Sequence, residues 1–145
     1  SMHDALQTTM TSKFVHGVWR PVTAIRRADE DGNPNTEPDV NWTPLLGNPP
    51  YPAYAGNHAA IGTSQATILA LIFGRDDIAF QHTWEGAGGA TRSYTGFNQM
   101  ANEEERSRVY GGIHFTFDQT AGQSAGRNVA NYVFQNFMRP RNCNF

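Results

Sequence analysis

Apolar residues recur at helical spacing over most of the chain, three, four or seven positions apart. Pro21 interrupts the first such run, because a proline inside a helix removes a backbone donor and kinks or restarts the helix. Gly74 follows the second run, where a glycine commonly ends a helix. The pattern predicts helices over residues 4–27 with a break at Pro21, from the turn at 55–58 to 73, from about 97 to 109, and over 119–138, where Pro140 follows.

The same spacing predicts which face of each helix is buried. The first helix would bury Leu6, Met10 and Phe14. Gly122 and Gly126 would allow the last helix to pack closely against a neighbour. The stripe expected to be buried on that helix consists of Ala121, Ala125, Val129, Tyr132, Val133 and Phe137.

Two segments lack this pattern. Residues 28–52 are rich in proline, asparagine and aspartate, which predicts a long irregular loop of the kind that is often functional or flexible. Residues 75–91 are ambiguous, and Ile78, Phe80 and Trp84 indicate a short helix before the glycine-rich stretch 86–89. Since no strand-like alternation is present, we predict an all-α fold, a helical bundle forming one domain over residues 1–145.

Composition and charge narrow the classes of function. A formal net charge of -2 argues against general nucleic-acid binding, which needs a basic field. The single cysteine, Cys143, excludes an internal disulfide and a zinc-binding cysteine cluster. No apolar run is long enough to span a bilayer, so we expect a soluble protein without a membrane span.

The first two residues, Ser1 and Met2, resemble a tag remnant. We expect the chain to be the C-terminal, site-bearing part of a longer protein. Its sequence leaves the localisation open, and a secreted or periplasmic full-length protein is compatible with it.

The stretch from Glu105 to Asp118 carries the densest group of chemically useful residues. The Gly111-Gly112 pair would end one helix near Tyr110 and turn the chain, since glycine is unfavourable inside a helix. His114 and Asp118 would open the next helix, with the carboxylate holding one imidazole nitrogen. A buried pair that only caps a helix would give the same pattern.

Two earlier segments add cations and amide donors. Lys13, the only lysine, and Arg20 lie seven residues apart and so could converge on one point, although a solvated cationic face has the same spacing. The turn Gly56-Asn57-His58 opens a helix, and free backbone N–H groups at such a terminus bind anions. An ordinary turn with a surface histidine is the alternative. Together with Arg108 and His114, these segments predict a site for a tetrahedral or trigonal oxyanion.

This arrangement resembles the signature of the superfamily that holds vanadium-dependent haloperoxidases and type 2 phosphatidic acid phosphatases. The signature reads Lys, six residues, Arg-Pro; then Pro-Ser-Gly-His; then Ser-Arg, five residues, His, three residues, Asp. The first part is present from Lys13 to Pro21, and the third is complete from Ser107 to Asp118. Residues 19–26 and 110–115 resemble the bacterial haloperoxidase-like branch. The resemblance runs from about Asp4 to Val133 and implies the helical-bundle fold of this superfamily.

The chain departs from the middle part of the signature. Where the family has Pro-Ser-Gly-His, this chain has Ala55-Gly56-Asn57-His58, which keeps the histidine and lacks the serine hydroxyl. We expect a backbone N–H of Gly56 to substitute for it and Asn57 to add an amide donor. Loss of one donor in a preorganised oxyanion site can cost on the order of 3 kcal/mol of transition-state stabilisation. The departure therefore predicts a reduced rate or a weaker vanadate affinity.

Carried over to this chain, the resemblance implies a vanadate cofactor, with phosphate suited to the same site. His114 would be the metal ligand, oriented by Asp118. His58 would move protons while hydrogen peroxide is taken up and a halide is oxidised. The vanadate oxygens would be neutralised by Lys13, Arg20 and Arg108, helped by the amides of Gly56 and Asn57.

Two other functions use the same residues. In an acid phosphatase, His114 would attack a phosphoester to give a phosphohistidine, and His58 would protonate the leaving oxygen. A non-catalytic or degenerate oxyanion-binding domain is the third. Because relatives of this branch are longer, we also expect an exposed apolar groove that a second copy fills, and hence a homo-oligomer.

Overall fold

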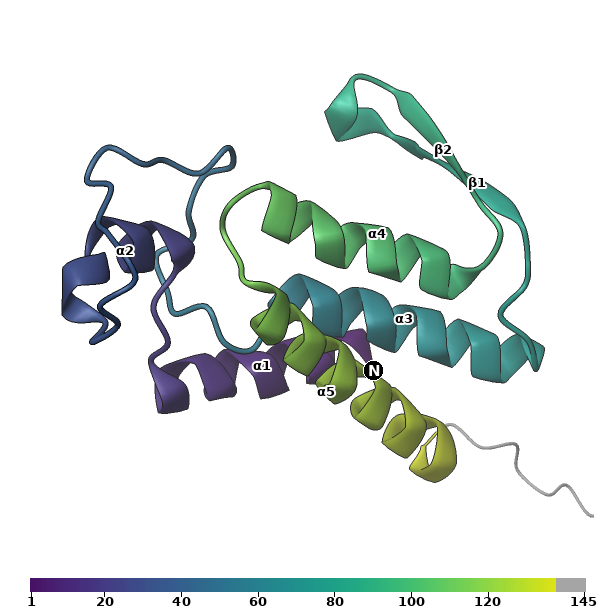
Figure 1. Ribbon diagram of the computed structural model, residues 1–145. Coiled ribbons are helices and arrows are strands. Elements are labelled where there is room, and N and C mark those ends of the chain that lie inside the picture. The colour runs from purple at the N-terminus through teal and green to yellow at the C-terminus, as the bar shows by residue number, and fades with distance from the viewer. Residues whose placement is uncertain (138–145) are drawn as a thin grey trace, which may run out of the picture.

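The computed structural model describes residues 1–137, and Met138, Pro140 and Cys143 of the sequence predictions lie outside them. Figure 1 shows a helical bundle with one small hairpin, so the predicted helical-bundle class is confirmed. In chain order the elements are α1 (Met2–His16), α2 (Pro21–Arg26), the short 3-10 helix η1 (Ala28–Glu30), α3 (Asn57–Phe73), β1 (Phe80–Trp84), η2 (Glu85–Ala87), β2 (Ala90–Tyr94), α4 (Phe97–Tyr110) and α5 (Thr116–Asn136).

Helix α3 is the centre of the bundle, and α1, α4 and α5 all pack against it (Figure 1). It is suited to this position because small side chains occupy its buried faces, which lets three helices approach it closely. Its buried residues are Asn57, Ala59, Ala60, Gly62, Thr63, Ser64 and Ala66.

The contact between α3 and α5 depends on two glycines, as the sequence predicted. A Cβ added at Gly122 would lie 3.0 Å from the carbonyl carbon of Gly56, and one at Gly126 would lie 3.0 Å from that of Ala60. Real Cβ atoms would push the helices apart at both places. The start of α5 is therefore held directly against the start of α3, where the predicted site residues lie.

Residues 80–94 form an antiparallel hairpin, so the predicted short helix over Ile78, Phe80 and Trp84 is wrong. Phe80 pairs with Tyr94 across the hairpin, and both rings lie within 6 Å of a neighbouring aromatic ring. Most other hairpin residues are exposed. Because only this end of the hairpin is covered, the strands show no alternation of apolar and polar residues that the sequence could reveal.

The buried faces of α1 and α5 differ from the prediction. Helix α1 buries Ala5, Thr9 and Lys13, whereas Phe14 is 68% exposed. Helix α5 turns its small residues toward α3, and this leaves Tyr132 and Phe137 exposed. For α5 the glycines that approach α3 lie on the buried face, and in both helices large apolar side chains face outward.

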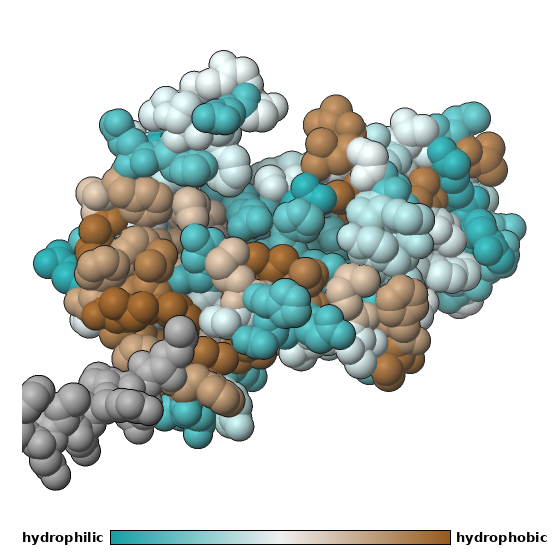
Figure 2. All heavy atoms as spheres, turned by 180° about the vertical axis from the view of Figure 1, so that it is seen from behind, coloured by the Kyte–Doolittle hydropathy of each residue, from teal (hydrophilic) through white to brown (hydrophobic). Residues whose placement is uncertain are grey.

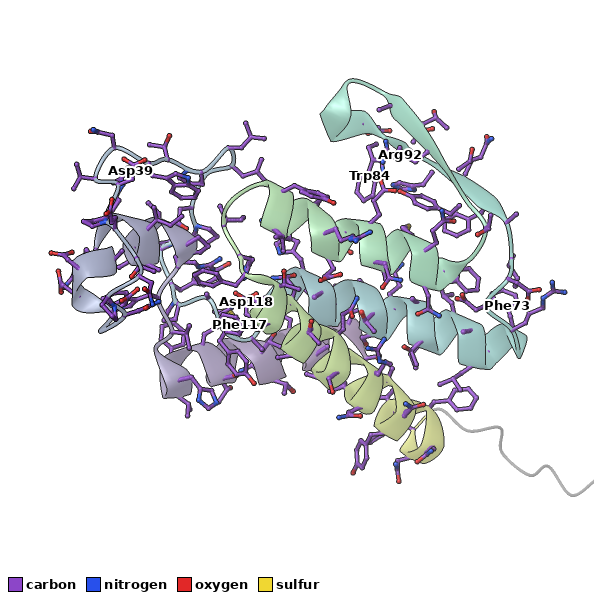
Figure 3. All side chains as sticks on the ribbon, in the orientation of Figure 1. Asp39, Phe73, Trp84, Arg92, Phe117 and Asp118 are labelled. Carbon is purple, nitrogen blue, oxygen red and sulfur yellow. The ribbon has the colours of Figure 1, made fainter. Side chains whose placement is uncertain are left out.

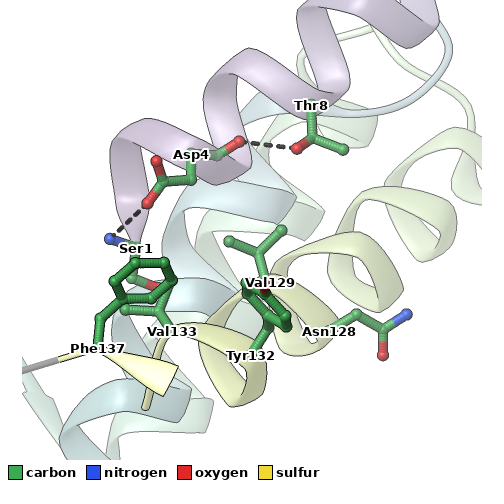
Figure 4. A pocket seen from close by; sticks show the side chains of 8 residues that line it. All are labelled: Ser1, Asp4, Thr8, Asn128, Val129, Tyr132, Val133 and Phe137. Atoms are coloured by element: carbon green, nitrogen blue, oxygen red, sulfur yellow. Dashed lines mark hydrogen bonds and ion pairs between the residues drawn. The ribbon is translucent and has the colours of Figure 1, made fainter. Parts of the chain in front are cut away.

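The outward apolar side chains of α5 line a groove of about 790 Å³ beside α1 (Figure 4). Figure 2, seen from behind, shows apolar side chains gathered around the C-terminal end of α5. The groove is lined by Ser1, Asp4, Thr8, Asn128, Val129, Tyr132, Val133 and Phe137. A groove of the expected kind is therefore present, and its occupation by a second copy stays a prediction.

The predicted long loop is confirmed, since only η1 interrupts the irregular chain between α2 and α3. The loop is tied to the bundle by backbone hydrogen bonds from Leu46 N–H to Gly111 and from Ala53 N–H to Val18. Within residues 1–137, no helix is both long and apolar enough to cross a membrane.

Candidate oxyanion site

His114 and Asp118 form the buried pair that the sequence predicted. Helix α4 ends at Tyr110, and Gly112 adopts a left-handed φ of 72° in the turn that follows. His114 lies two residues before Thr116, where α5 begins, and its Nδ1 is 2.7 Å from Asp118 Oδ1. The second oxygen of Asp118 accepts the N–H of Phe115 at 3.1 Å, which caps the start of α5. Both side chains of the pair are almost fully buried.

Arg20 approaches His114 from the opposite side of the ring. Its Nη1 lies 2.9 Å from His114 Nε2 and also donates to the carbonyl oxygen of Ile113 at 2.7 Å. Since a guanidinium only donates, Nε2 must carry the lone pair and Nδ1 the proton. Burial lowers the pKa of His114 against the opposing effect of Asp118, which agrees with a neutral ring.

Lys13 is fully buried and faces the same region from α1. Its ammonium group donates to the carbonyl oxygens of Ala53 and Ala55, at 2.6 and 2.7 Å. Burial, and next the charge of Arg20, lower the pKa of Lys13 to about 8, while Asp118 opposes the shift. Lys13 thus fixes the segment before α3 and keeps its third N–H for another acceptor.

Tyr51 is a member of this cluster that sequence reasoning assigned only to the loop. Its ring lies 5.1 Å from the Arg20 guanidinium carbon and 5.5 Å from Lys13 Nζ, and its carbonyl oxygen accepts Arg20 Nε at 2.8 Å. These contacts stabilise two neighbouring cations that would otherwise repel each other.

The middle segment differs from the prediction in one important respect. The backbone N–H of Gly56 donates to the carbonyl oxygen of Asp118 at 2.8 Å, so it is not free to replace the absent serine hydroxyl. The amide of Asn57 donates to the sulfur of Met10 at 3.0 Å, away from His114 and toward α1. The remaining donors at this place are the first backbone N–H groups of α3, which have no acceptor within the helix.

His58 and Arg108 lie on one cavity of about 380 Å³ between α3, α4 and the hairpin. Burial is the main cause that lowers the pKa of His58 to about 4, and the charge of Arg108 is the next. His58 is therefore neutral near pH 7 and able to accept a proton. The side chains of Trp84 and Arg92, labelled in Figure 3, lie on the side of the hairpin that faces α4. The other lining residues are Trp84, Tyr94, Met100, Glu103, Glu104 and Ser107.

Two buried cationic donors in this region have no partner among the described residues. They are Arg20 Nη2 and Arg108 Nε. A buried, charged donor without an acceptor is costly, and an anion placed between such donors would remove that cost. Vanadate and phosphate both carry the negative charge and the acceptor oxygens that such donors require. Within residues 1–137, no group of three or more His, Cys, Asp or Glu side chains is arranged to hold a metal ion.

The structure therefore brings Arg20, His114 and Asp118 into contact, with Lys13 beside them, and it places His58 and Arg108 on one cavity. The N–H of Gly56 and the amide of Asn57 have other partners. Together the fold and the site define a helical-bundle domain that buries a histidine–aspartate pair among a lysine and two arginines. The chain belongs to the vanadium-dependent haloperoxidase superfamily, because the family model described as VCPO second helical-bundle domain matches residues 1–142.

Solved structures agree with this assignment. The chain is similar to the first bacterial vanadium-dependent iodoperoxidase, with 30% identity and a TM-score of 0.80 over 92% of the chain and 30% of that protein. The apo-type bacterial vanadium-dependent chloroperoxidase shares the fold at 16% identity and a TM-score of 0.73, over 91% of the chain and 33% of that protein. The chain thus spans about a third of the length of these proteins. No match is found among curated proteins.

Sequence reasoning missed two polar residues that touch the site. Gln119 is fully buried and donates to Asp118, and Glu104 lines the cavity with His58. Gln119 lies on the same helical face as Gly122 and Gly126, the face that packs closely against α3. A polar residue on such a face needs a hydrogen-bond partner, and this was the sequence signal that could have identified Gln119. Burial raises the pKa of Glu104.

Proposed function

We propose that this chain carries the vanadate site of a haloperoxidase that oxidises halide with hydrogen peroxide. The observation that carries the proposal is a pair of buried donors, Arg20 Nη2 and Arg108 Nε, that have no partner among the described residues, with the Arg20 guanidinium in contact with the neutral imidazole of His114. The match to the family model and the similarity to an iodoperoxidase support it.

His114 Nε2 would be the ligand, because it carries the lone pair while Asp118 holds Nδ1–H and fixes the ring. Arg20, Arg108 and Lys13 would neutralise the oxygens of the oxyanion. When bound, vanadate would act as a Lewis acid that activates hydrogen peroxide, without redox cycling of the metal.

His58 would take up the proton that hydrogen peroxide loses. A pKa of about 4 keeps the imidazole unprotonated at neutral pH, with its nitrogen free to accept. The half-buried position of His58 on the cavity gives small molecules a route to the ring. In the phosphatase alternative, the same neutral His114 would be the nucleophile and a phosphoester the substrate.

A non-catalytic oxyanion-binding domain is favoured by one specific observation. The N–H of Gly56 is already donated to Asp118, so the site has one donor fewer than the family signature supplies. Binding would survive this change better than turnover, since transition-state stabilisation depends on each donor.

The test is bromide- or iodide-dependent halogenation of a phenol dye by hydrogen peroxide, with and without orthovanadate. Turnover that needs orthovanadate and is lost in His114→Ala supports the haloperoxidase. Hydrolysis of a phosphate monoester that orthovanadate inhibits would instead establish the phosphatase. An oxyanion-dependent rise in melting temperature without either turnover would establish the binding domain.

A further inference from the structure

Gln119 makes the contact that completes the surroundings of Asp118. Its Nε2 donates to Asp118 Oδ1 at 2.9 Å, the same oxygen that accepts His114 Nδ1 at 2.7 Å. The other oxygen of Asp118 is taken by the N–H of Phe115. Gln119 Oε1 has no partner among the described residues, so the donation to Asp118 sets the orientation of the amide.

The same side chain covers Gly56. A Cβ added at Gly56 would lie 2.8 Å from Gln119 Cδ and closer still to Nε2. Gly56 has φ -69° and ψ 112°, a conformation open to any residue, so the glycine is required by the neighbouring amide and not by backbone strain. The backbone bond from Gly56 N–H to Asp118 O joins the two segments at this point.

We propose that Gln119 is a positioning residue of the site, which holds Asp118 and through it the ring of His114. Gly56 and Gln119 form a matched pair, in which the amide fills the space that a side chain at position 56 would need. The expected effect of Gln119 on oxyanion binding rests on the proposed function. The contacts of Gln119 with Asp118 and Gly56 rest on the geometry alone.

The first test removes the hydrogen bond from Gln119 to Asp118 and keeps the volume of the side chain. Gln119→Met keeps the length of the side chain and removes the donor. The Nδ1–H proton resonance of His114, assigned by its loss in His114→Gln, should then move downfield, because Asp118 Oδ1 loses a competing donor. Orthovanadate affinity should fall by about tenfold, as expected for the loss of one buried hydrogen bond to a charged group. An unmoved resonance together with unchanged affinity would overturn the positioning role.

The matched pair is tested by a double-mutant cycle. Gly56→Ala should lower the melting temperature, or prevent folding, because its methyl group collides with the amide of Gln119. Adding Gln119→Ala should restore a folded protein with at least half of the lost melting temperature, since the smaller side chain leaves room. A double variant no more stable than Gly56→Ala would overturn the pairing.

These readouts also separate this inference from the proposed function. If the wild-type chain binds no oxyanion, the proposed function fails. The proton resonance and the stability cycle still decide the role of Gln119 in that case, because neither needs a bound ligand.

Discussion

Arg20 donates to the nitrogen of His114 that would bind an oxyanion, at 2.9 Å from Nη1 to Nε2. The guanidinium therefore covers the lone pair of the imidazole, while its Nη2 is buried with no partner within residues 1–137. An incoming oxyanion would offer both nitrogens of Arg20 an acceptor and release Nε2. In the proposed site, Arg20 would thus both shield Nε2 of His114 and supply positive charge to the bound oxyanion.

Removal of this cation should change the titration of His114. The charge of Arg20 is one of the causes that lower the pKa of His114. We therefore expect the pKa of His114 to rise in Arg20→Met, measured from its ring resonances by NMR. Orthovanadate affinity should fall by at least about tenfold, because a charged donor is lost. A lowered pKa in this variant would contradict the assigned contact.

Stability should rise with pH across the acidic range. The pKa of His58 is about 4 in the folded chain and 6.5 in the unfolded chain, so between these values only the unfolded chain binds the proton. The free energy of unfolding should increase from pH 4 to about 6.5 and change little from there until Lys13, whose pKa is about 8, begins to titrate. His114 contributes with the same sign as His58, whereas Glu104, whose pKa is raised by burial, opposes the rise. Urea denaturation at several pH values should show a shallower rise in His58→Gln. His3→Gln, which alters an exposed histidine, should leave the profile unchanged.

Lys13→Met should destabilise the fold as well as the site. It leaves the carbonyl oxygens of Ala53 and Ala55 without their buried donor, at a cost of about 2–4 kcal/mol in the free energy of unfolding. Urea denaturation measures this loss. Arg106→Ala removes an exposed cation and should change the free energy by less than about 0.5 kcal/mol. Equal stability of both variants would argue against the buried position of Lys13.

Gly126→Ala should weaken the contact between α3 and α5. Its Cβ would press on the backbone of Ala60, and we expect a loss of about 1–3 kcal/mol by chemical denaturation. Gly47→Ala is the matched control, because no atom lies within 4 Å of a Cβ at that position. It should be neutral or slightly stabilising.

The sequence predicted the parts of this structure that local spacing controls. The turn at Gly111 and Gly112 and the pairing of His114 with Asp118 follow from residues close together in the chain. The meeting of Lys13 and Arg20 with His114 was suggested by the chemistry of these residue types and supported by the family signature, because nothing local connects segments so far apart.

The errors have physical causes that single-sequence patterns do not carry. Helix α5 packs against α3 through Gly122 and Gly126, so Tyr132 and Phe137 remain exposed. The N–H of Gly56 was expected to face an oxyanion. It bonds to Asp118 instead, since the helix contact brings that carbonyl oxygen within 2.8 Å.

The most direct test of the oxyanion site is calorimetric titration of orthovanadate into the wild-type chain, Arg108→Ala and Arg106→Ala. Arg108 has a buried Nε with no partner in the part of the chain that the structure describes, whereas Arg106 is exposed on the same helix. We predict saturable one-to-one binding that Arg108→Ala weakens by at least about tenfold and Arg106→Ala leaves unchanged. Equal effects of the two substitutions, or no binding to the wild-type chain, would contradict an oxyanion site at His114.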